Sequence, residues 1–184
     1  TVLGARADAE LARVIAAAEL SSGQAAFQQI RQQARSRNRP PVLARLLATL
    51  GYEHGDARLH EANAIVGRAT SDGDTGQDIA TANIYLSLAA GDEAGVRAGL
   101  AMLPQDLGAD PEAALARSRA LLFAGSVDQA ELDARMAAGA RPDGVRYVLQ
   151  LARVQAARGD GATARATLLA SPAVVQTAAG RLAL

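Results

Sequence analysis

Apolar and polar positions along this chain alternate with the period of amphipathic helices. In the segment 142–158, apolar side chains recur at spacings of three and four residues, at Val145, Val148, Leu149, Ala152 and Ala156. One face of a helix buries residues at this spacing. The preceding segment continues the pattern with Leu115, Leu121, Leu122 and Phe123. The chain is therefore predicted to be built of helices.

Short polar turns interrupt these helical segments at an almost constant interval. They are Ser21-Ser22, Gly55-Asp56, Gly91-Asp92, Gly125-Ser126 and Gly159-Asp160, and the steps between them are 34, 36, 34 and 34 residues. Glycine accepts the left-handed conformation just past a helix, and Asp or Ser can cap the helix that follows. A fixed period in this range is typical of stacked helix–turn–helix repeats.

The turns divide the chain into predicted helix pairs. These are 6–20 with 23–36, 40–53 with 56–70, 75–90 with 93–103, 110–124 with 127–138, and 142–158 with 161–170. Asp110-Pro111-Glu112 has the composition of a helix start, and Pro104, Pro142 and Pro172 stand where second helices should stop. We expect one superhelical domain over 1–184, with repeats at 6–38, 40–74, 75–108, 110–141 and 142–171 and a terminal helix at 172–184. Neither end carries a dedicated polar cap, which favours a segment of a longer array.

Composition narrows the class of protein. The chain has 184 residues, of which 49% are hydrophobic and 3% aromatic, so Ala, Leu, Val and Ile must build the core of an all-α fold. Nineteen basic residues balance nineteen acidic ones, which argues against nucleic acid as the main ligand. Every basic residue is Arg, and the richness in Arg and Ala indicates a GC-rich bacterial source.

The same composition leaves the compartment open between the bacterial periplasm or envelope and the cytoplasm. The absence of cysteine excludes disulfides and thiol chemistry. No apolar run approaches the 18 or so residues of a membrane span. The first residue is Thr1 and not Met, which is compatible with a processed terminus or with a cut from a longer protein.

Small residues at fixed places around the turns resemble the tetratricopeptide repeat (TPR) family. Seven residues before a turn stand Ala48, Ser118 and Ala152, and five residues after a turn stand Ala26, Ala130 and Ala164. Pro142 occupies the place of the family's terminal proline. Val14, His60, Ile84 and Val96 depart from the pattern. The resemblance implies a right-handed α-solenoid of about five helix pairs, in which the first helix of each pair lines a concave groove.

The resemblance also implies which side chains face that groove. The candidate partner-binding residues are Arg45, Tyr52, Asp78, Thr81, Tyr85, Arg119, Phe123, Arg146 and Arg153, with Thr49, Glu53, Leu88, Leu115 and Leu149 at neighbouring positions. Aromatic side chains would give rigid apolar contact with a bound peptide, and arginines would give forked hydrogen bonds. The alternative is that Tyr52 and Phe123 fill core space, and that Arg119, Arg146 and Arg153 are solvated charges.

Other candidate features carry weaker signals. A basic patch of Arg31, Arg35, Arg37 and Arg39 either attracts an acidic partner, a membrane or a nucleic acid, or is a solvated helix end. The segment 71–78 resembles a calcium loop, but Asn83 stands where a bidentate acid is needed, and a longer link between repeats explains the segment. His54 and His60 are too few for a zinc site. We expect no catalytic residue, metal or cofactor.

These observations predict a non-catalytic scaffold that binds a peptide or helix of a protein partner in its groove. At the level of the family, such arrays in bacteria serve secretion, pilus, motility or exopolysaccharide-export assemblies. One alternative is the targeting or regulatory arm of a larger glycan-modifying or glycosyltransferase enzyme. Another is an RNA-binding helical repeat, which the zero net charge disfavours. Self-association through the end helices, especially 173–184, is a further alternative.

Overall fold

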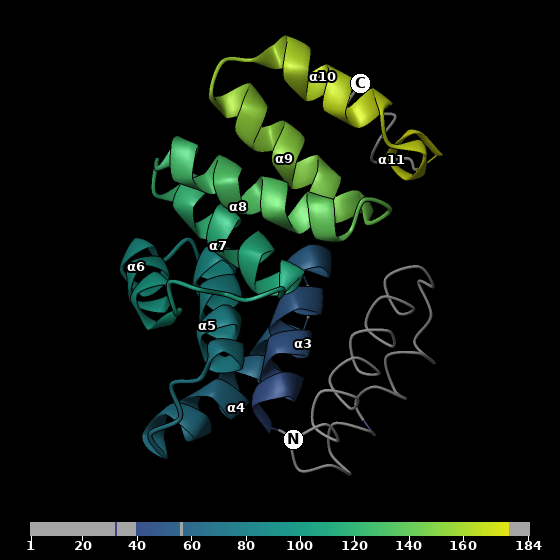
Figure 1. Cartoon of the computed structure of the whole chain (residues 1–184). Coiled ribbons are helices and arrows are strands. Elements are labelled where there is room, and N and C mark those ends of the chain that lie inside the picture. The colour runs from purple at the N-terminus through teal and green to yellow at the C-terminus, as the bar shows by residue number, and fades with distance from the viewer. Residues whose placement is uncertain (1–31, 33–39, 56, 177–184) are drawn as a thin grey trace.

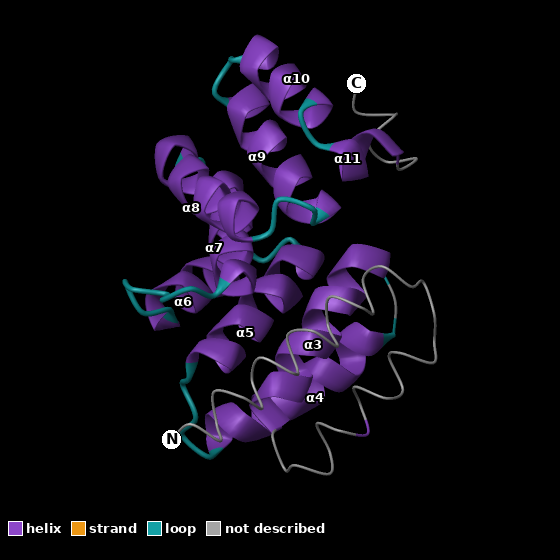
Figure 2. Cartoon of the chain, turned by 45° about the vertical axis from the view of Figure 1, so that its right-hand side comes forward, coloured by secondary structure: helices purple, strands orange, loops and turns teal. Residues whose placement is uncertain are grey.

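The protein is all-helical over the part that the structure describes. The structure is a computed structural model, and it describes residue 32 and residues 40–55 and 57–176. Within these residues it contains nine helices and no strand (Figures 1 and 2). The helices are α3 (Pro40–His54), α4 (Arg58–Ser71), α5 (Gln77–Ala90), α6 (Glu93–Met102), α7 (Pro111–Phe123), α8 (Val127–Ala140), α9 (Val145–Ala157), α10 (Gly161–Leu169) and α11 (Pro172–Gln176).

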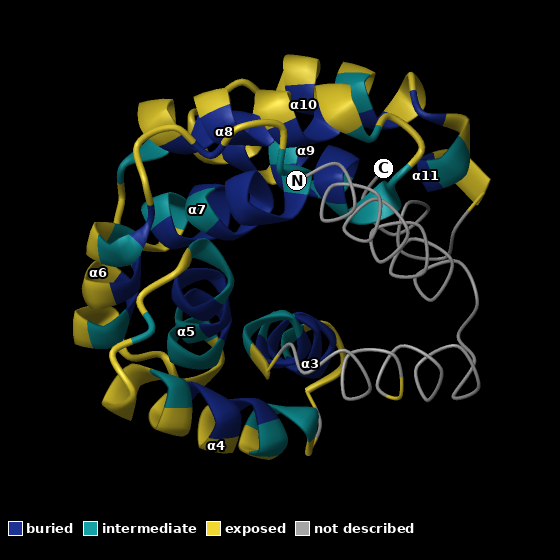
Figure 3. Cartoon of the chain, turned by 60° about the horizontal axis from the view of Figure 1, so that its bottom comes forward, coloured by how far each residue is buried: buried dark blue, intermediate teal, exposed yellow. Residues whose placement is uncertain are grey.

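The helices form pairs that pack in the order of the sequence. Each first helix packs on its own second helix, and α3, α5, α7 and α9 also pack on one another in succession. Figure 3 shows these four helices along the inner side of an arc, with α4, α6, α8 and α10 along its outer side. We call the side formed by α3, α5, α7 and α9 the inner face. The stacking of neighbouring helices is thus repeat-like, as the period of the sequence predicts.

The turns within the pairs have the backbone geometry that their glycines predict. Gly91 ends α5 with a φ of 67°, and its N–H donates to the carbonyl of Leu88 while the N–H of Asp92 donates to Ser87. This pair of bonds satisfies carbonyls that the helix end would otherwise leave open. The same two bonds recur around Gly125 and Gly159. The three described helix pairs that contain Gly91, Gly125 and Gly159 therefore share the same left-handed turn.

The predicted helix caps are confirmed at only some positions. Asp160 accepts from the N–H of Thr163, and Asp110 accepts from the N–H groups of Glu112 and Ala113. Asp92 and Ser126 occupy the predicted cap positions but make no side-chain cap bond. The first two helices of the sequence prediction, and the residues after Gln176, lie outside the described part.

Small residues let the helices approach closely. The predicted packing positions Ala48, Ser118 and Ala130 are fully buried, and so are the larger Ile84 and Val96. The hydroxyl of Ser118 donates to the carbonyl of Ala130 at 2.8 Å and joins α7 to α8. By contrast, His60 is exposed, so α4 does not use its packing position in the same way.

The start of α9 differs from the prediction. The helix begins at Val145 and not at residue 142, because residues 141–144 form a turn in which Gly144 donates to the carbonyl of Arg141. Pro142 therefore lies in the link between α8 and α9. Proline has no backbone N–H, and at this position no helical hydrogen bond is lost.

Candidate functional site

A column of four charged residues runs along the inner face, one from each first helix. Its members are Arg45 on α3, Asp78 on α5, Glu112 on α7 and Arg146 on α9, and we call it the charge column. Arg45 Nη1 donates to Asp78 Oδ1 at 2.9 Å, and the two residues are 33 apart in sequence. Arg146 Nη2 donates to Glu112 Oε2, and these two are 34 apart. Two pairs of residues one repeat apart thus carry opposite charges and pair across helices, whereas Asp78 and Glu112 carry the same charge.

Asp110 binds Arg45 at one end of this column. It receives a forked bond from Arg45, with both nitrogen–oxygen distances at 2.6 Å, and a further bond from Gln77 Nε2 at 2.9 Å. Forked pairing of this kind is the strongest geometry that arginine and a carboxylate form. Burial alone would raise the pKa of Asp110, but the bonds from Arg45 outweigh it and hold the pKa below its usual value. Asp110 therefore both caps α7 and ties it to α3.

Glu112 lies at the centre of the column and is buried. The hydroxyl of Tyr85 donates to Glu112 Oε1 at 2.6 Å, that of Thr49 donates to the same oxygen at 3.4 Å, and that of Tyr147 donates to Oε2 at 3.3 Å. Burial would raise the pKa of this carboxyl, but Arg146 and Arg45 together lower it. The group is consequently an anion held by donors from α3, α5 and α9.

Tyr85 completes the link between the charges and the aromatic rings. Its side chain is fully buried, and burial together with the negative charge of Glu112 raises its pKa well above the ordinary value. The phenol therefore stays protonated and acts as a hydrogen-bond donor. Its ring lies 5.3 Å from that of Tyr52 on α3, centroid to centroid.

A second column, the aromatic column, lies beside the first and consists of Tyr52, Tyr85 and Arg119. The guanidinium of Arg119 stands over both rings, at 5.1 Å from the centroid of Tyr52 and 5.6 Å from that of Tyr85. Arg119 Nη1 also lies 2.6 Å from Glu53 Oε1 in an ion pair. Only 6% of Arg119 is exposed, so stacking and pairing together hold a buried cation.

The inner face is exposed at one end. Phe123, one helical turn after Arg119, is 46% exposed. Arg153, one repeat after Arg119, is exposed and forms no ion pair with any described residue. The charges of Arg45, Asp78, Glu112 and Arg146 are all paired, in contrast. The exposed end thus offers an aromatic ring and a cation to a partner.

The structure brings most of the predicted groove residues together, but in different environments. Thr81 and Tyr85 are fully buried, and the hydroxyl of Thr81 has no hydrogen-bond partner among the described residues. Tyr52 is half-buried, and Phe123 does not fill core space. Arg119 is not a solvated charge, whereas Arg153 is exposed as the alternative interpretation expects.

Sequence analysis did not place Glu112, Asp110, Gln77 or Tyr147 in this site. Glu112 and Asp110 were assigned only to the start of a helix. The spacing of the charges contains the signal that would have found Glu112, because it stands 34 residues after Asp78 and 34 before Arg146. Opposite charges at equivalent positions of adjacent repeats are expected to meet when repeats stack.

Several other candidate features have a simpler place in the structure. In the segment 71–78, Asp74 accepts a hydrogen bond from the N–H of Gly76, which closes a local turn before α5. No three His, Asp or Glu side chains gather as a metal site within the described ranges. No described helix combines the length and apolar character of a membrane span. The basic patch of Arg31, Arg35, Arg37 and Arg39 lies outside the described residues.

Comparison of the chain with models of protein families, with curated proteins and with solved structures finds no match.

Proposed function

We propose that this chain is a non-catalytic, TPR-like scaffold that binds a peptide or helix of a protein partner on its inner face. The observation that carries the proposal is the exposed end of that face. There, Phe123 and Arg153 are exposed, one helical turn and one repeat after Arg119. Aromatic rings and arginines are the residue types that most often supply the binding energy of an interface.

The charge column supports the same proposal. Taking charged groups out of water is costly, and well-packed apolar residues often stabilise a fold equally well. Ion pairs on the described inner face nevertheless involve three arginines and four carboxylates, namely Arg45, Arg119, Arg146, Glu53, Asp78, Asp110 and Glu112. Their retention there favours a role in specificity, since charges fixed by mutual pairing present a defined electrostatic pattern to a partner.

The buried residues of the face have a supporting role in this proposal. Tyr85 and Glu112 have almost no exposed surface, so they cannot supply most of the contact with a partner. They instead hold Arg119 and Arg146 in fixed positions. Preorganised side chains lose less conformational entropy on binding than flexible ones do.

A display experiment tests the proposal without knowledge of the natural partner. A library of random peptides displayed on phage is selected on the immobilised chain, and the affinity of the recovered peptides is measured by fluorescence anisotropy. In the double variant Phe123→Ala/Arg153→Ala we expect binding to weaken about tenfold or more, because each anchor lost from an interface typically costs over 1 kcal/mol.

The matched control removes an exposed large apolar residue and an exposed arginine from the outer side of the arc. Leu132 on α8 is 67% exposed, and Arg97 on α6 is exposed and, among the described residues, pairs only with the nearby Glu93. The double variant Leu132→Ala/Arg97→Ala is expected to bind the selected peptides like the unmodified chain. Equal loss in both double variants, or a selection that recovers no specific peptide, would contradict the proposal.

A further inference from the structure

Arg153 presents a positive charge on the inner face that no described carboxylate neutralises. It lies seven residues after Arg146, which is two helical turns, and the two arginines therefore project from the same side of α9. Arg146 bonds to Glu112 on α7, which identifies this side as the inner face. Arg153 is exposed and forms no ion pair within the described part of the chain.

The neighbouring helix offers Arg153 a like charge in place of a counter-ion. Glu112 and Arg146 are 34 residues apart and pair between α7 and α9. Two turns further along the same helices, Arg119 and Arg153 are also 34 residues apart, but both are cations. Arg119 stands over the tyrosine rings of the aromatic column and pairs with Glu53 on α3. The carboxylate that would complete the pairing at α9 is therefore not supplied by the described residues.

The distribution of charge along the chain adds to this effect. Residues 145–176 carry four arginines and one carboxylate, whereas residues 40–144 carry eight arginines and fifteen carboxylates. Within α9 the only charged residues are Arg146 and Arg153. A charged segment that approaches the inner face thus meets positive charge at α9 and carboxylates on the helices before it. Such a gradient directs an acidic group toward α9.

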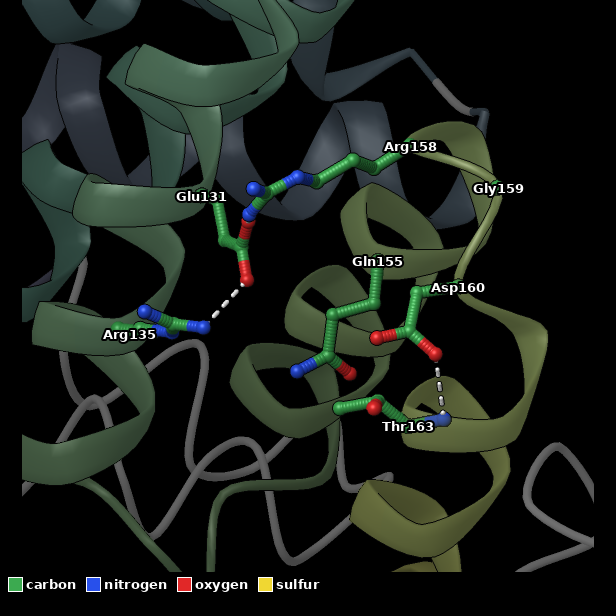
Figure 4. Close-up of a pocket in the computed structure, with 7 residues that line it drawn as sticks. All are labelled: Glu131, Arg135, Gln155, Arg158, Gly159, Asp160 and Thr163. Atoms are coloured by element: carbon green, nitrogen blue, oxygen red, sulfur yellow. Dashed lines mark hydrogen bonds and ion pairs between the residues drawn. The ribbon is translucent and has the colours of Figure 1, made fainter.

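The cavity between α8, α9 and α10 shows the opposite arrangement (Figure 4). Arg158, at the end of α9, points to Glu131 on α8, and its Nη1 donates to Oε2 at 2.6 Å. Arg135 donates to the other oxygen of the same carboxylate, also at 2.6 Å. The charges on that side of α9 are therefore paired within the protein, and Arg153 is the arginine of α9 that a partner can pair.

The surroundings of Arg153 include apolar side chains. Leu149, one turn before it on α9, is half-buried. Phe123 is 46% exposed and lies one turn beyond Arg119, the residue of α7 that is equivalent to Arg153. Solvent and salt screen a partly buried ion pair less than a fully exposed one. A carboxylate carried next to a large apolar side chain therefore fits this end of the inner face best.

We propose that the partner segment bound on the inner face carries an acidic side chain beside a large apolar one. Its carboxylate pairs with Arg153, whose forked donors match a planar carboxylate, and its apolar side chain packs on Phe123. This inference rests on the function proposed above and specifies the chemistry of the partner. A nucleic acid fits less well, because its continuous negative charge would also meet the partly exposed Glu53 and Asp78.

Peptide selection on charge variants tests this inference. Random peptides displayed on phage are selected in parallel on the unmodified chain, Arg153→Gln, Arg153→Glu and the control Arg165→Gln. Arg165 on α10 is likewise exposed and has no ion-pair partner among the described residues. We expect acidic residues beside large apolar ones to be enriched on the unmodified chain and on Arg165→Gln. This enrichment should be absent on Arg153→Gln, and basic residues should replace the acidic ones on Arg153→Glu.

A charge exchange then measures the ion pair itself. One peptide recovered on the unmodified chain is synthesised with its acidic residue, with the corresponding amide and with arginine at that position, and binding is followed by fluorescence anisotropy. The amide should bind the unmodified chain about fivefold more weakly than the acid does, the upper end of the range for an exposed ion pair. Arg153→Gln should bind acid and amide alike, and Arg153→Glu should prefer the peptide that carries arginine.

The outcomes separate this inference from the function on which it rests. Peptides that Phe123→Ala weakens, but that show no acidic enrichment and bind Arg153→Gln unchanged, would overturn the inference and leave inner-face binding in place. Equal losses in Arg153→Gln and Arg165→Gln would also overturn it, because they would reflect overall charge. Saturable binding of a single-stranded oligonucleotide that Arg153→Gln abolishes, without acidic enrichment among the peptides, would assign the arginine to phosphate. Recovery of no specific peptide would overturn both proposals.

Discussion

Replacing Tyr85 by phenylalanine tests whether the hydroxyl of this residue holds the inner face together. The substitution keeps the ring and therefore the stacking with Tyr52 and Arg119. It removes only the hydrogen bond that the hydroxyl donates to Glu112 at 2.6 Å. Because the ring volume is unchanged, no cavity forms, and the change in stability reports the hydrogen bond alone.

The expected loss follows from the charge of the acceptor. A hydrogen bond to a charged group contributes about 1.5–3 kcal/mol to stability. Glu112 keeps its bonds from Arg146 and Tyr147 in the variant, so it is not left unpaired. We therefore expect Tyr85→Phe to lower the free energy of unfolding by about 2 kcal/mol, near the lower end of that range.

Urea unfolding followed by circular dichroism measures this loss, and Tyr52→Phe provides the matched control. Tyr52 is half-buried in the same aromatic column, and its hydroxyl forms no hydrogen bond with a described residue. Removing the hydroxyl of Tyr52 should change the free energy of unfolding by less than about 0.5 kcal/mol. A double-mutant cycle of Tyr85→Phe with Glu112→Gln should give a coupling energy of about 1 kcal/mol.

Two results would refute this reasoning. One is a loss of equal size in Tyr85→Phe and Tyr52→Phe, which would mean that the hydroxyl of Tyr85 is not special. The other is additivity of Tyr85→Phe and Glu112→Gln within about 0.3 kcal/mol, which would mean that the two groups do not interact.

Further predictions concern pH and the glycines. The pKa values of Asp110 and Glu112 are lower in the folded state than their ordinary values of 3.8 and 4.5. The two carboxylates therefore stabilise the fold fully at a pH above these ordinary values. This stabilisation is lost as the pH falls through the folded-state pKa of each group. Urea midpoints between neutral pH and about pH 3 should therefore fall less in Glu112→Gln than in the unmodified chain, and an equal fall in both would contradict the pairing. Gly91→Ala should destabilise by about 1 kcal/mol, because φ is 67° there although the space beside it is open. Gly67→Ala, inside α4 and equally open, should stabilise by about 0.5–1 kcal/mol in thermal or urea unfolding, and a shift of the same sign in both glycine variants would argue against the left-handed turn.

Local signals in the sequence predict the helices and their turns well. Gly91, Gly125 and Gly159 end helices because a residue without a side chain enters the left-handed region at little cost, and that property depends only on neighbouring residues. The small packing positions at Ala48 and Ser118 are equally local consequences of close helix approach. The helix start at Asp110 is read correctly for the same reason.

The charge pairs were not predicted, because they form between residues far apart in the sequence. Arg45 and Asp110 are separated by 65 residues, and only the stacking of α3, α5 and α7 brings them within 2.6 Å. The repeat length indicates that equivalent positions of neighbouring repeats meet. It does not indicate which side chains turn toward one another and pair. Arg119 is buried for a related reason, since two rings from other helices cover a side chain that is usually solvated.

Site-specific photocrosslinking tests the proposed inner-face binding most directly. A benzophenone side chain is placed at position 123 in one protein and at position 132 in another, because Phe123 and Leu132 are both exposed apolar residues but lie on an inner and an outer helix. Each protein is irradiated with a peptide selected on the unmodified chain. Crosslinking from position 123 and not from position 132 is the predicted result. Crosslinking from position 132 alone, or equally from both, would contradict binding on the inner face.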